Sequence, residues 1–595
     1  MDGHRLRNPL RSLALALAFI CGCTPLWSLV VPEQRSLDIR DYSELPRAPL
    51  QTIPPPETVS DAPAEKAVPK QLSLDEAIRI GLANSNVIRI LVGVTAVASG
   101  QTIYDPAISN TDVDVARSVF DPAFFINNNW TRSELPQGFL APKSPLGAFI
   151  FGSRDDNYGL DLGLSQRNIL GGTAKLEYID NLSRFNPGIF PLNPQNQTAL
   201  SLSYTQSLLK GAGIGPNTAP IVIARINTEI SYFQLKDSVQ EMVRGVIEAY
   251  WNVVFARDDV KARADQERTG KEEYDREKGR FDKGFSTEGE VAQRRVAWYN
   301  FRATLIASEA NLIQREAALR NILGLPPPTD RDRFELTTEP NTRRIEPKWE
   351  EITRLAEERR PDLIELKLIL EADQQSILIA NNQARPQVDA TMFYRWNGLE
   401  GHTPSGVSIE TGAGQFTDWN LGVNFSVPLG LRKDRAALRR SELIMKRDEA
   451  NLDQGLHAAL HTLAGNVRNL ALFYEQYLVY KETEVAARIN LQQQKALVRT
   501  GKAIFIVELQ AITDLANAAS AKAQALVQYN TELANLERQT GTILDTHGVR
   551  FFEERFRAIG PLGRMGPTRD YPASVLPSPN VERYQTPEPI PAPKK

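Results

Sequence analysis

The sequence predicts a mainly α protein in which a long antiparallel coiled coil is joined to a transmembrane β-barrel. Three observations predict this fold class: helical runs with a seven-residue repeat, regions of strand-like alternation, and an export signal followed by no apolar run long enough for a membrane helix. A chain without a transmembrane helix can cross a membrane only as a closed β-barrel. Its 595 residues, 42% hydrophobic and 24% charged, exclude bulk disorder. The 69 basic and 72 acidic residues leave a net charge of −3, which argues against nucleic-acid binding.

Residues 1–22 are predicted to be a signal peptide. Three arginines precede an apolar run over residues 13–20 that is too short to span a bilayer. The order Ile20-Cys21-Gly22-Cys23 resembles a bacterial lipoprotein cleavage box, so cleavage before Cys23 would expose a cysteine for lipidation. Thr24 stands where an aspartate usually retains lipoproteins in the inner membrane. We therefore expect a lipid-anchored outer-membrane protein; the alternative is an ordinary signal peptide with an incidental cysteine.

Proline-rich segments flank the part that is predicted to fold. Residues 23–70 carry eight prolines from position 31 onward and no hydrophobic period, which is typical of an extended linker. Residues 549–595 carry nine prolines in a similar setting. We expect a tether behind Cys23 at one end and a disordered or draped tail without an assigned role at the other.

The region between these segments repeats itself. One ungapped shift of 217 residues joins four identical pairs: Asn252 and Asn469, Gly284 and Gly501, Leu319 and Leu536, and Gly324 and Gly541. Near the front of each half the shift grows to 275, so the first half holds about 58 residues (275 − 217) that the second lacks. An internal duplication therefore predicts two repeats, over residues 71–325 and 345–545.

Each repeat contains the pattern of a long helical hairpin, over about 219–324 and about 431–544. The turns fall at Gly284 and Gly501, and Ser286 and Thr287 are suitable caps for the helix after the first turn. Seven-residue spacing recurs in both halves: Val291, Trp298, Leu305, Leu312, Leu319; Val296, Ala303, Ala310, Ala317; and Phe505, Ile512, Ala519, Leu526, Leu533. A helix of about 60 residues is on the order of 90 Å long, so the hairpins are expected to form a long antiparallel bundle.

Two regions alternate apolar and polar residues, over about 120–207 and about 388–428. Segments such as 158–165, 200–206 and 419–425 place apolar groups on one face and small or polar groups on the other. Outer-membrane strands have this pattern, with tryptophan and tyrosine near the lipid interface, although a soluble β-sandwich also alternates. The export signal and the long hairpins favour the membrane alternative.

Four motifs, in order on the two repeats, resemble those of the TolC-like outer-membrane efflux protein family. They are Leu-Ser-Leu-Asp-Glu-Ala-Ile at 72–78, Phe120-Asp121-Pro122 before the first strand, Gln206-Ser-Leu-Leu-Lys-Gly211 after the first β region, and Val427-Pro428-Leu429-Gly430 after the second. The resemblance covers about residues 72–544. It implies a homotrimer whose protomers share one outer-membrane β-barrel and one periplasmic α-helical barrel. Gly211, Pro428 and Gly430 then mark the junctions between the two.

The resemblance also implies that the tunnel closes at the turns of Gly284 and Gly501. There a periplasmic adaptor protein docks, and an inner-membrane pump supplies the energy. Relatives carry aspartates six and nine residues past the second glycine, where this chain has valine and glutamine. Glu290 and Glu508 are the candidate aperture carboxylates instead. Because the family's minimal pattern has two strands per repeat, the extra residues of the first half either add a hairpin to the barrel or enlarge a loop.

No catalytic, cofactor or metal site is expected. His457 and His461 are four residues apart on a predicted helix but lack an acidic partner in the same turn, which favours a hydrated helix face over a metal pair. The glycines at 211–215 lack the Lys-Ser or Lys-Thr of a nucleotide-binding loop and suit a strand-to-helix junction. The predicted function is a passive exit duct for pumped small molecules. The alternatives are a duct for type I protein secretion and a periplasmic coiled-coil scaffold or adaptor.

Overall fold

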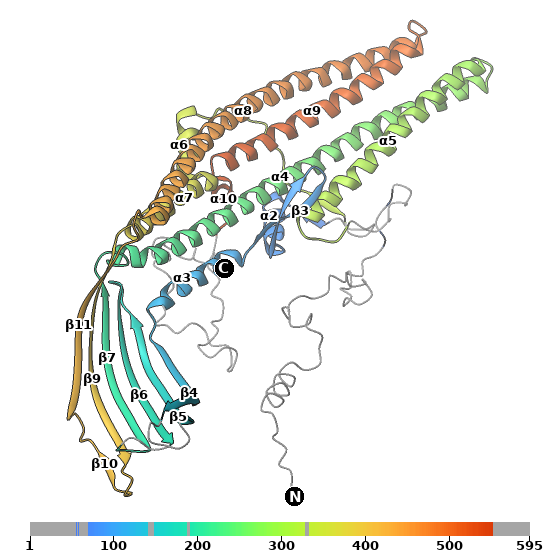
Figure 1. Ribbon diagram of the computed structural model, residues 1–595. Coiled ribbons are helices and arrows are strands. Elements are labelled where there is room, and N and C mark those ends of the chain that lie inside the picture. Colours follow the sequence, from blue (N-terminus) through green and yellow to red (C-terminus); the bar gives the residue numbers. More distant parts are fainter. Residues whose placement is uncertain are drawn as a thin grey trace, which may run out of the picture. The chain divides into compact units, whose positions relative to one another are not determined.

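The computed structural model describes residues 55, 58, 70–140, 148–186, 191–327 and 333–550 (Figure 1). The predicted signal peptide, Cys23, nearly all of the linker and the tail beyond residue 550 lie outside these residues. Among the described residues, no helix is both long and apolar enough to cross a lipid bilayer.

The first helical hairpin consists of α4 (Ile214–Phe281) and α5 (Glu288–Ile322). With 68 residues, α4 is roughly 100 Å long at about 1.5 Å per residue. It begins five residues before the boundary expected from its hydrophobic pattern, so Gly215 is already helical rather than part of the junction. The predicted cap is confirmed, since Thr287 is the N-cap residue of α5.

The second hairpin consists of α8 (Arg432–Arg499) and α9 (Phe505–Gln539), and it copies the first in length. The long helices have 68 residues each and the shorter ones 35 each. A shift of 217 residues carries the bounds of α5 onto those of α9 and those of α4 to within one residue of α8. Helix α4 packs against both α5 and α9, so it joins the two hairpins.

Six long strands form one antiparallel sheet, drawn side by side in Figure 1. They are β4 (Ala123–Leu140), β5 (Ala148–Arg167), β6 (Gly172–Asn186), β7 (Gln195–Ser207), β9 (Gln387–His402) and β11 (Phe416–Ser426). Their order across the sheet is β11-β9-β7-β6-β5-β4, and the short β10 (Ser408–Glu410) pairs with the far end of β9. Strands β4 and β11 are therefore the two edges.

The extra residues of the first half include a hairpin that is paired into the sheet, so they are more than an enlarged loop. The first half contributes β4, β5, β6 and β7 to the sheet, whereas the second contributes β9, β11 and the short β10. The added hairpin β4–β5 is paired to β6 from Arg167 to Arg154, over the whole length that β6 offers.

Smaller elements complete the fold, and some of them contribute to the main hydrophobic core around α4. They are β1 (Lys70–Leu72), α2 (Leu74–Ala83), β2 (Val87–Val92), β3 (Thr95–Thr102), α3 (Asp105–Arg117), η3 (Ser118–Phe120), β8 (Phe334–Leu336), α6 (Trp349–Arg359), α7 (Pro361–Gln383) and α10 (Ile543–Thr546). Buried Tyr250 of α4 donates a hydrogen bond to the carbonyl oxygen of Leu72 (3.1 Å) and accepts one from the N–H of Thr338 (3.0 Å). These bonds fix α4 against the parallel pair β1–β8.

The two predicted seams of α5 are buried unequally within the chain. Along the first seam, Val291, Trp298, Leu305 and Leu312 are half-buried and Leu319 is buried. On the second seam, Val296 is 60% exposed. The buried positions nearer the turn are instead Arg294, Ala297, Phe301 and Ser308. Near the turn, helix α5 therefore presents a slightly rotated face to its neighbours. Val296 and Ala303 of the small-residue seam are exposed there, whereas Ala310 and Ala317 are half-buried.

Candidate functional site

One face of the sheet is apolar across all six strands. Cross-strand pairing aligns Phe124, Leu164, Leu176, Leu202, Tyr394 and Trp419 in a single row from β4 to β11. All six side chains are exposed. We call this side of the sheet the apolar face. A continuous apolar surface of this extent is unfavourable in water and suits contact with lipid.

The opposite face of the same strands is polar and carries ion pairs. Lys175 and Glu177 of β6 lie 2.6 Å apart, and Arg395 of β9 is 2.6 Å from Asp418 of β11. Because side chains alternate along a strand, these residues point away from the apolar face. An apolar side and a charged side on one sheet are what a wall between lipid and water requires.

The first strand-to-helix junction is held by one buried side chain that the sequence did not single out. Asn382 of α7 is 3% exposed. Its Oδ1 accepts a hydrogen bond from the N–H of Gly211 (2.8 Å), and its Nδ2 donates to the carbonyl oxygens of Leu209 (3.2 Å) and Ala212 (3.0 Å). Gly211 has φ +82°, which favours glycine. The amide comes from the other repeat, about 170 residues along the chain, so no local motif reveals it.

Replacing Asn382 by alanine is expected to loosen this junction. The variant leaves the N–H of Gly211 and the carbonyl oxygen of Ala212 without their Asn382 partner, whereas the carbonyl oxygen of Leu209 still accepts from the N–H of Ala212 (3.3 Å). A buried polar group left unsatisfied costs about 1–3 kcal/mol. We expect faster hydrogen–deuterium exchange over residues 207–217 and a lower unfolding temperature. Asn381→Ala is the matched control, since Asn381 is exposed and adjacent. Equal effects of the two substitutions would show that the hydrogen bonds of Asn382 do not stabilise the junction.

The second junction contains a pair of residues with positive φ. Gly430 has φ +95° and Leu431 has φ +50°, which is uncommon for a residue with a side chain. The N–H of Leu431 donates to the carbonyl oxygen of Pro428 (3.1 Å), and α8 starts directly afterwards. The motif residues Pro428 and Gly430 therefore lie in the turn that redirects the chain from β11 into α8.

Both hairpin turns use the same glycine motif. Gly284 (φ +79°) is followed by Phe285, whose N–H donates to the carbonyl oxygen of Arg280 (2.9 Å). Gly501 (φ +73°) is followed by Lys502, whose N–H donates to the carbonyl oxygen of Leu497 (2.9 Å). A glycine in this conformation satisfies the last carbonyl groups of a helix and ends it.

The exposed carboxylate of Glu290 caps the helix after the first turn. It accepts hydrogen bonds from the N–H of Thr287 (2.9 Å) and from the hydroxyl of Ser286 (2.9 Å). These bonds, led by the one to the Thr287 backbone, lower the pKa of Glu290 below its usual value. In return, the Thr287 hydroxyl accepts from the N–H of Glu290 (3.3 Å). Glu290 thus belongs to a reciprocal capping box.

Thr287→Ala is expected to fray the first turn of α5. Loss of an N-cap hydroxyl costs about 1 kcal/mol, within a range of about 0.5–2. Hydrogen–deuterium exchange should accelerate over residues 288–292 with little change elsewhere. Thr462→Ala is the control, because its exposed hydroxyl bonds only to the preceding turn within α8. Unchanged exchange in Thr287→Ala would show that the cap has no energetic role.

Glu508, the second predicted aperture carboxylate, lies inside the protein. It sits in the first turn of α9, is 0% exposed, and faces Glu273 of α4. Neither Glu508 oxygen has a hydrogen-bond donor among the described residues. Burial, with the nearby charge of Glu273, raises the pKa of Glu508 to about 7, while Arg276 and Lys495 act in the opposite direction. Near neutral pH Glu508 therefore holds its proton more readily than an exposed glutamate would.

A second contact ties the same ends of the hairpins together. The guanidinium group of Arg294 on α5 lies 4.3 Å from the ring centroid of Phe505 on α9. Arg294 also pairs with Glu277 of α4 at 3.2 Å. The sequence predicts the turns but not this cluster, because Phe505 is 211 residues (505 − 294) from Arg294 along the chain.

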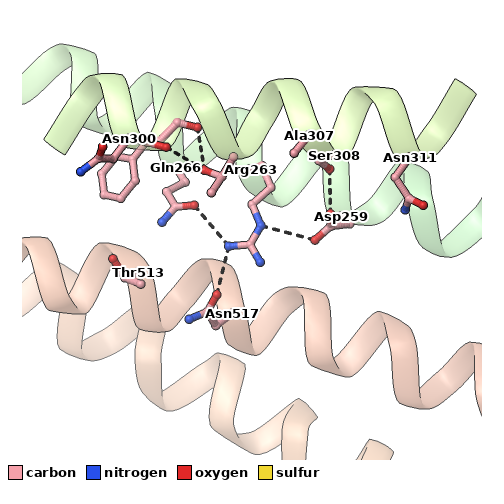
Figure 2. A pocket seen from close by; sticks show the side chains of 11 residues that line it. Asp259, Arg263, Gln266, Asn300, Ala307, Ser308, Asn311, Thr513 and Asn517 are labelled. Atoms are coloured by element: carbon pink, nitrogen blue, oxygen red, sulfur yellow. Dashed lines mark hydrogen bonds and ion pairs between the residues drawn. The ribbon is translucent and has the colours of Figure 1, made fainter. Parts of the chain in front are cut away.

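Farther from the turns, a polar hollow of about 550 Å³ lies between α4, α5 and α9 (Figure 2). Asp259 of α4 accepts hydrogen bonds from Ser308 of α5 and Ser520 of α9, both at 2.7 Å. Arg263, one turn along, donates to Asn517 of α9 (3.0 Å). These hydrogen bonds join side chains of the two hairpins to one another. The hollow is therefore best described as part of the contact between the hairpins.

His457 and His461, predicted to lie on a hydrated helix face, are exposed on α8, with ring centroids 4.5 Å apart. Among the described residues, no group of three histidine, cysteine, aspartate or glutamate side chains is arranged to hold a metal ion. His457 and His461 therefore have no third protein ligand within this part of the chain.

Comparison with known sequences agrees with this geometry. A family profile described as outer membrane efflux protein matches residues 193–325 and 352–542. The outer membrane protein TolC of Escherichia coli K12 is 23% identical over 358 residues, which cover 58% of this chain and 70% of TolC.

Solved structures share the fold. VceC of Vibrio cholerae, an outer membrane protein, aligns with a TM-score of 0.54 and 15% identity over 79% of this chain and 96% of VceC. The open state of the MtrE outer membrane channel of Neisseria gonorrhoeae aligns with a TM-score of 0.52 and 14% identity over 83% of this chain and 99% of MtrE. The profile covers both hairpins and more than half of the residues. The chain therefore belongs to the outer membrane efflux protein family.

Proposed function

We propose that this chain is one protomer of a trimeric exit duct that passively conducts small molecules across the periplasm and the outer membrane. Family membership supports an outer-membrane location and a channel rather than an enzyme. A duct of this kind needs no cofactor, because an inner-membrane pump supplies the energy. Its specificity lies in the width and charge of a water-filled path.

The observation that carries the proposal is the two-sided sheet joined to two hairpins of roughly 100 Å. The apolar face would contact lipid and the polar face would line the water-filled path. The long hairpins would continue that path into the periplasm. A single chain supplies only a segment of such a wall, since its sheet has two unpaired edges.

The turns at Gly284 and Gly501 are the proposed closed end and the docking place of a periplasmic adaptor. Glu290 is the exposed carboxylate there, while buried Glu508 would influence the aperture by holding the hairpins together. A protein-secretion duct would use the same architecture, so cargo size separates the two. A periplasmic scaffold would not need a lipid-facing sheet, which makes it the weaker alternative.

The test is to extract the full chain from outer membranes in detergent and compare its gel mobility before and after boiling, with the mass of the unboiled species determined. We expect a heat-sensitive trimer that forms conducting pores in planar bilayers. A monomeric periplasmic protein without conductance would overturn the duct and leave the scaffold.

Cys23 is the proposed lipid anchor. Mass spectrometry of the mature N-terminus should detect an acylated Cys23, and Cys23→Ala should abolish the modification. One acyl chain adds only reversible membrane binding, so we expect the trimer itself to survive the substitution. An unmodified mature N-terminus at another residue would restore the ordinary signal-peptide alternative.

A further inference from the structure

Six long strands in one chain exceed the four that two strands per repeat would give. The difference is the hairpin β4–β5, whose strands have 18 and 20 residues. A transmembrane strand needs about 9–11 residues. Both strands are therefore long enough to cross a bilayer and continue beyond it.

The hairpin continues the apolar face without a break. Phe124 of β4 pairs with Leu164 of β5, which pairs with Leu176 of β6. Nearer the hairpin end, Trp130 pairs with Tyr158, and their rings lie 5.3 Å apart. Aromatic side chains of this kind concentrate where an outer-membrane wall meets the lipid headgroups. A loop folded over the channel mouth would have no reason to repeat the alternation of β6 and β7.

The apolar residues also drift steadily along the strands from one edge of the sheet to the other. Relative to the row of Phe124, Leu176 and Trp419, they extend toward the hairpin end on β4 (to Trp130) and toward the helices on β11 (to Phe425). The centre of the apolar stretch moves by about six residues over five strand-to-strand steps. With about 3.3 Å per residue and about 4.8 Å between strands, this corresponds to a tilt of roughly 40°. Strands in closed membrane sheets tilt by about 35–45°.

The free edges complement each other. Within the part of the chain that the structure describes, strand β4 pairs only with β5, and β11 only with β9. Each neighbouring pair in the sheet is antiparallel, so five successive reversals make β4 and β11 run in opposite directions. Beside lipid, unpaired N–H and C=O groups cost several kcal/mol each. An edge β4 next to the edge β11 of a second copy would satisfy both in the pattern of the other pairs.

We propose that each chain contributes all six strands to the wall, with β11 of one copy paired to β4 of the next, so that a trimer closes an 18-strand barrel (three chains of six). This proposal rests on the proposed function, which supplies the trimer. Because barrel diameter grows roughly linearly with strand number, the membrane pore is about half again as wide as one built from four strands per chain. The partner at each edge is a second copy of this chain.

Disulfide trapping in the full chain tests which strand meets β11. Asn127 of β4 points to the polar face, and Asn127→Cys is combined in turn with Asp418→Cys, Asn420→Cys and Asn424→Cys on the same face of β11. The control series places the first cysteine on the polar face of β6, as Asn181→Cys, with the same three partners. Single-cysteine variants report any cross-linking through Cys23.

We expect covalent dimers and trimers from the Asn127 series alone. Trimers linked only through the Asn181 series would overturn the six-strand wall while leaving the duct intact, and so would trimers linked by neither series. A monomeric protein would contradict the proposed trimeric duct itself. Because a double variant can fail to assemble, cryo-electron microscopy of the unmodified trimer provides the second measurement: a count of 18 strands supports the proposal, and a count of 12 refutes it.

Discussion

Arginine in place of Leu202 is expected to abolish stable insertion of the protein into the outer membrane. Leu202 lies at the middle of the apolar row, exposed on β7 between Leu176 and Tyr394. A charged side chain on the lipid side of a membrane sheet costs about 2–4 kcal/mol near the midplane. At about 1.4 kcal/mol per factor of ten, this disfavours the assembled form by roughly 30- to 1000-fold.

The control for Leu202→Arg is Ser203→Arg, one residue along β7 on the polar face. We expect its trimer to assemble normally and its pore to become less permeable to cations, since the new charge would lie in the water-filled path. The measurements are the yield of heat-sensitive trimer and the ion selectivity in planar bilayers. Normal insertion of Leu202→Arg with failure of Ser203→Arg would invert the assignment of the two faces.

The second large effect is a loss of contact between the hairpin ends as pH rises through 7. The folded state raises the pKa of Glu508 from its ordinary value of 4.5 to about 7. A carboxyl group whose pKa is raised by folding binds its proton more tightly in the folded state, so its contribution is complete below about pH 4.5. The contribution is lost as the pH passes 7, when Glu508 becomes charged beside Glu273.

The size of this effect follows from the shift. A difference between 4.5 and about 7 corresponds to at most about 3 kcal/mol, and solvent screening near the turns reduces it toward about 1 kcal/mol. Hydrogen–deuterium exchange over residues 505–512, corrected for intrinsic rates, should therefore accelerate roughly 5- to 30-fold between pH 5.5 and 8.5, because part of the contribution is already lost at pH 5.5.

Glu508→Gln is expected to remove this pH dependence and to protect the same residues at pH 8.5, because glutamine stays neutral. Glu272→Gln serves as the control, since Glu272 is exposed on α4 next to Glu273. It should leave the pH dependence unchanged. A wild-type profile that is flat between pH 5.5 and 8.5 would show that Glu508 does not titrate there.

The elements that depend on local periodicity and chain geometry could be predicted before the structure was known. Seven-residue spacing over long stretches predicted the hairpins, and glycine followed by a capping threonine marked the first turn, because helix ends have strict local requirements. Period-two alternation located the strands. The repeat shift of 217 predicted two hairpins, and the same shift carries the bounds of α5 onto those of α9.

The neighbours of each strand, and the contacts between side chains distant in sequence, could be identified only in three dimensions. Alternation is the same in a membrane hairpin and in an enlarged loop, so the position of β4–β5 in the sheet required the pairing itself. Asn382 accepts a hydrogen bond from Gly211, and Glu508 faces Glu273, although the two residues of each pair are more than 150 positions apart in the sequence. Such contacts depend on how helices pack side by side, and a pattern read along one chain carries no information about the distance between two of its turns.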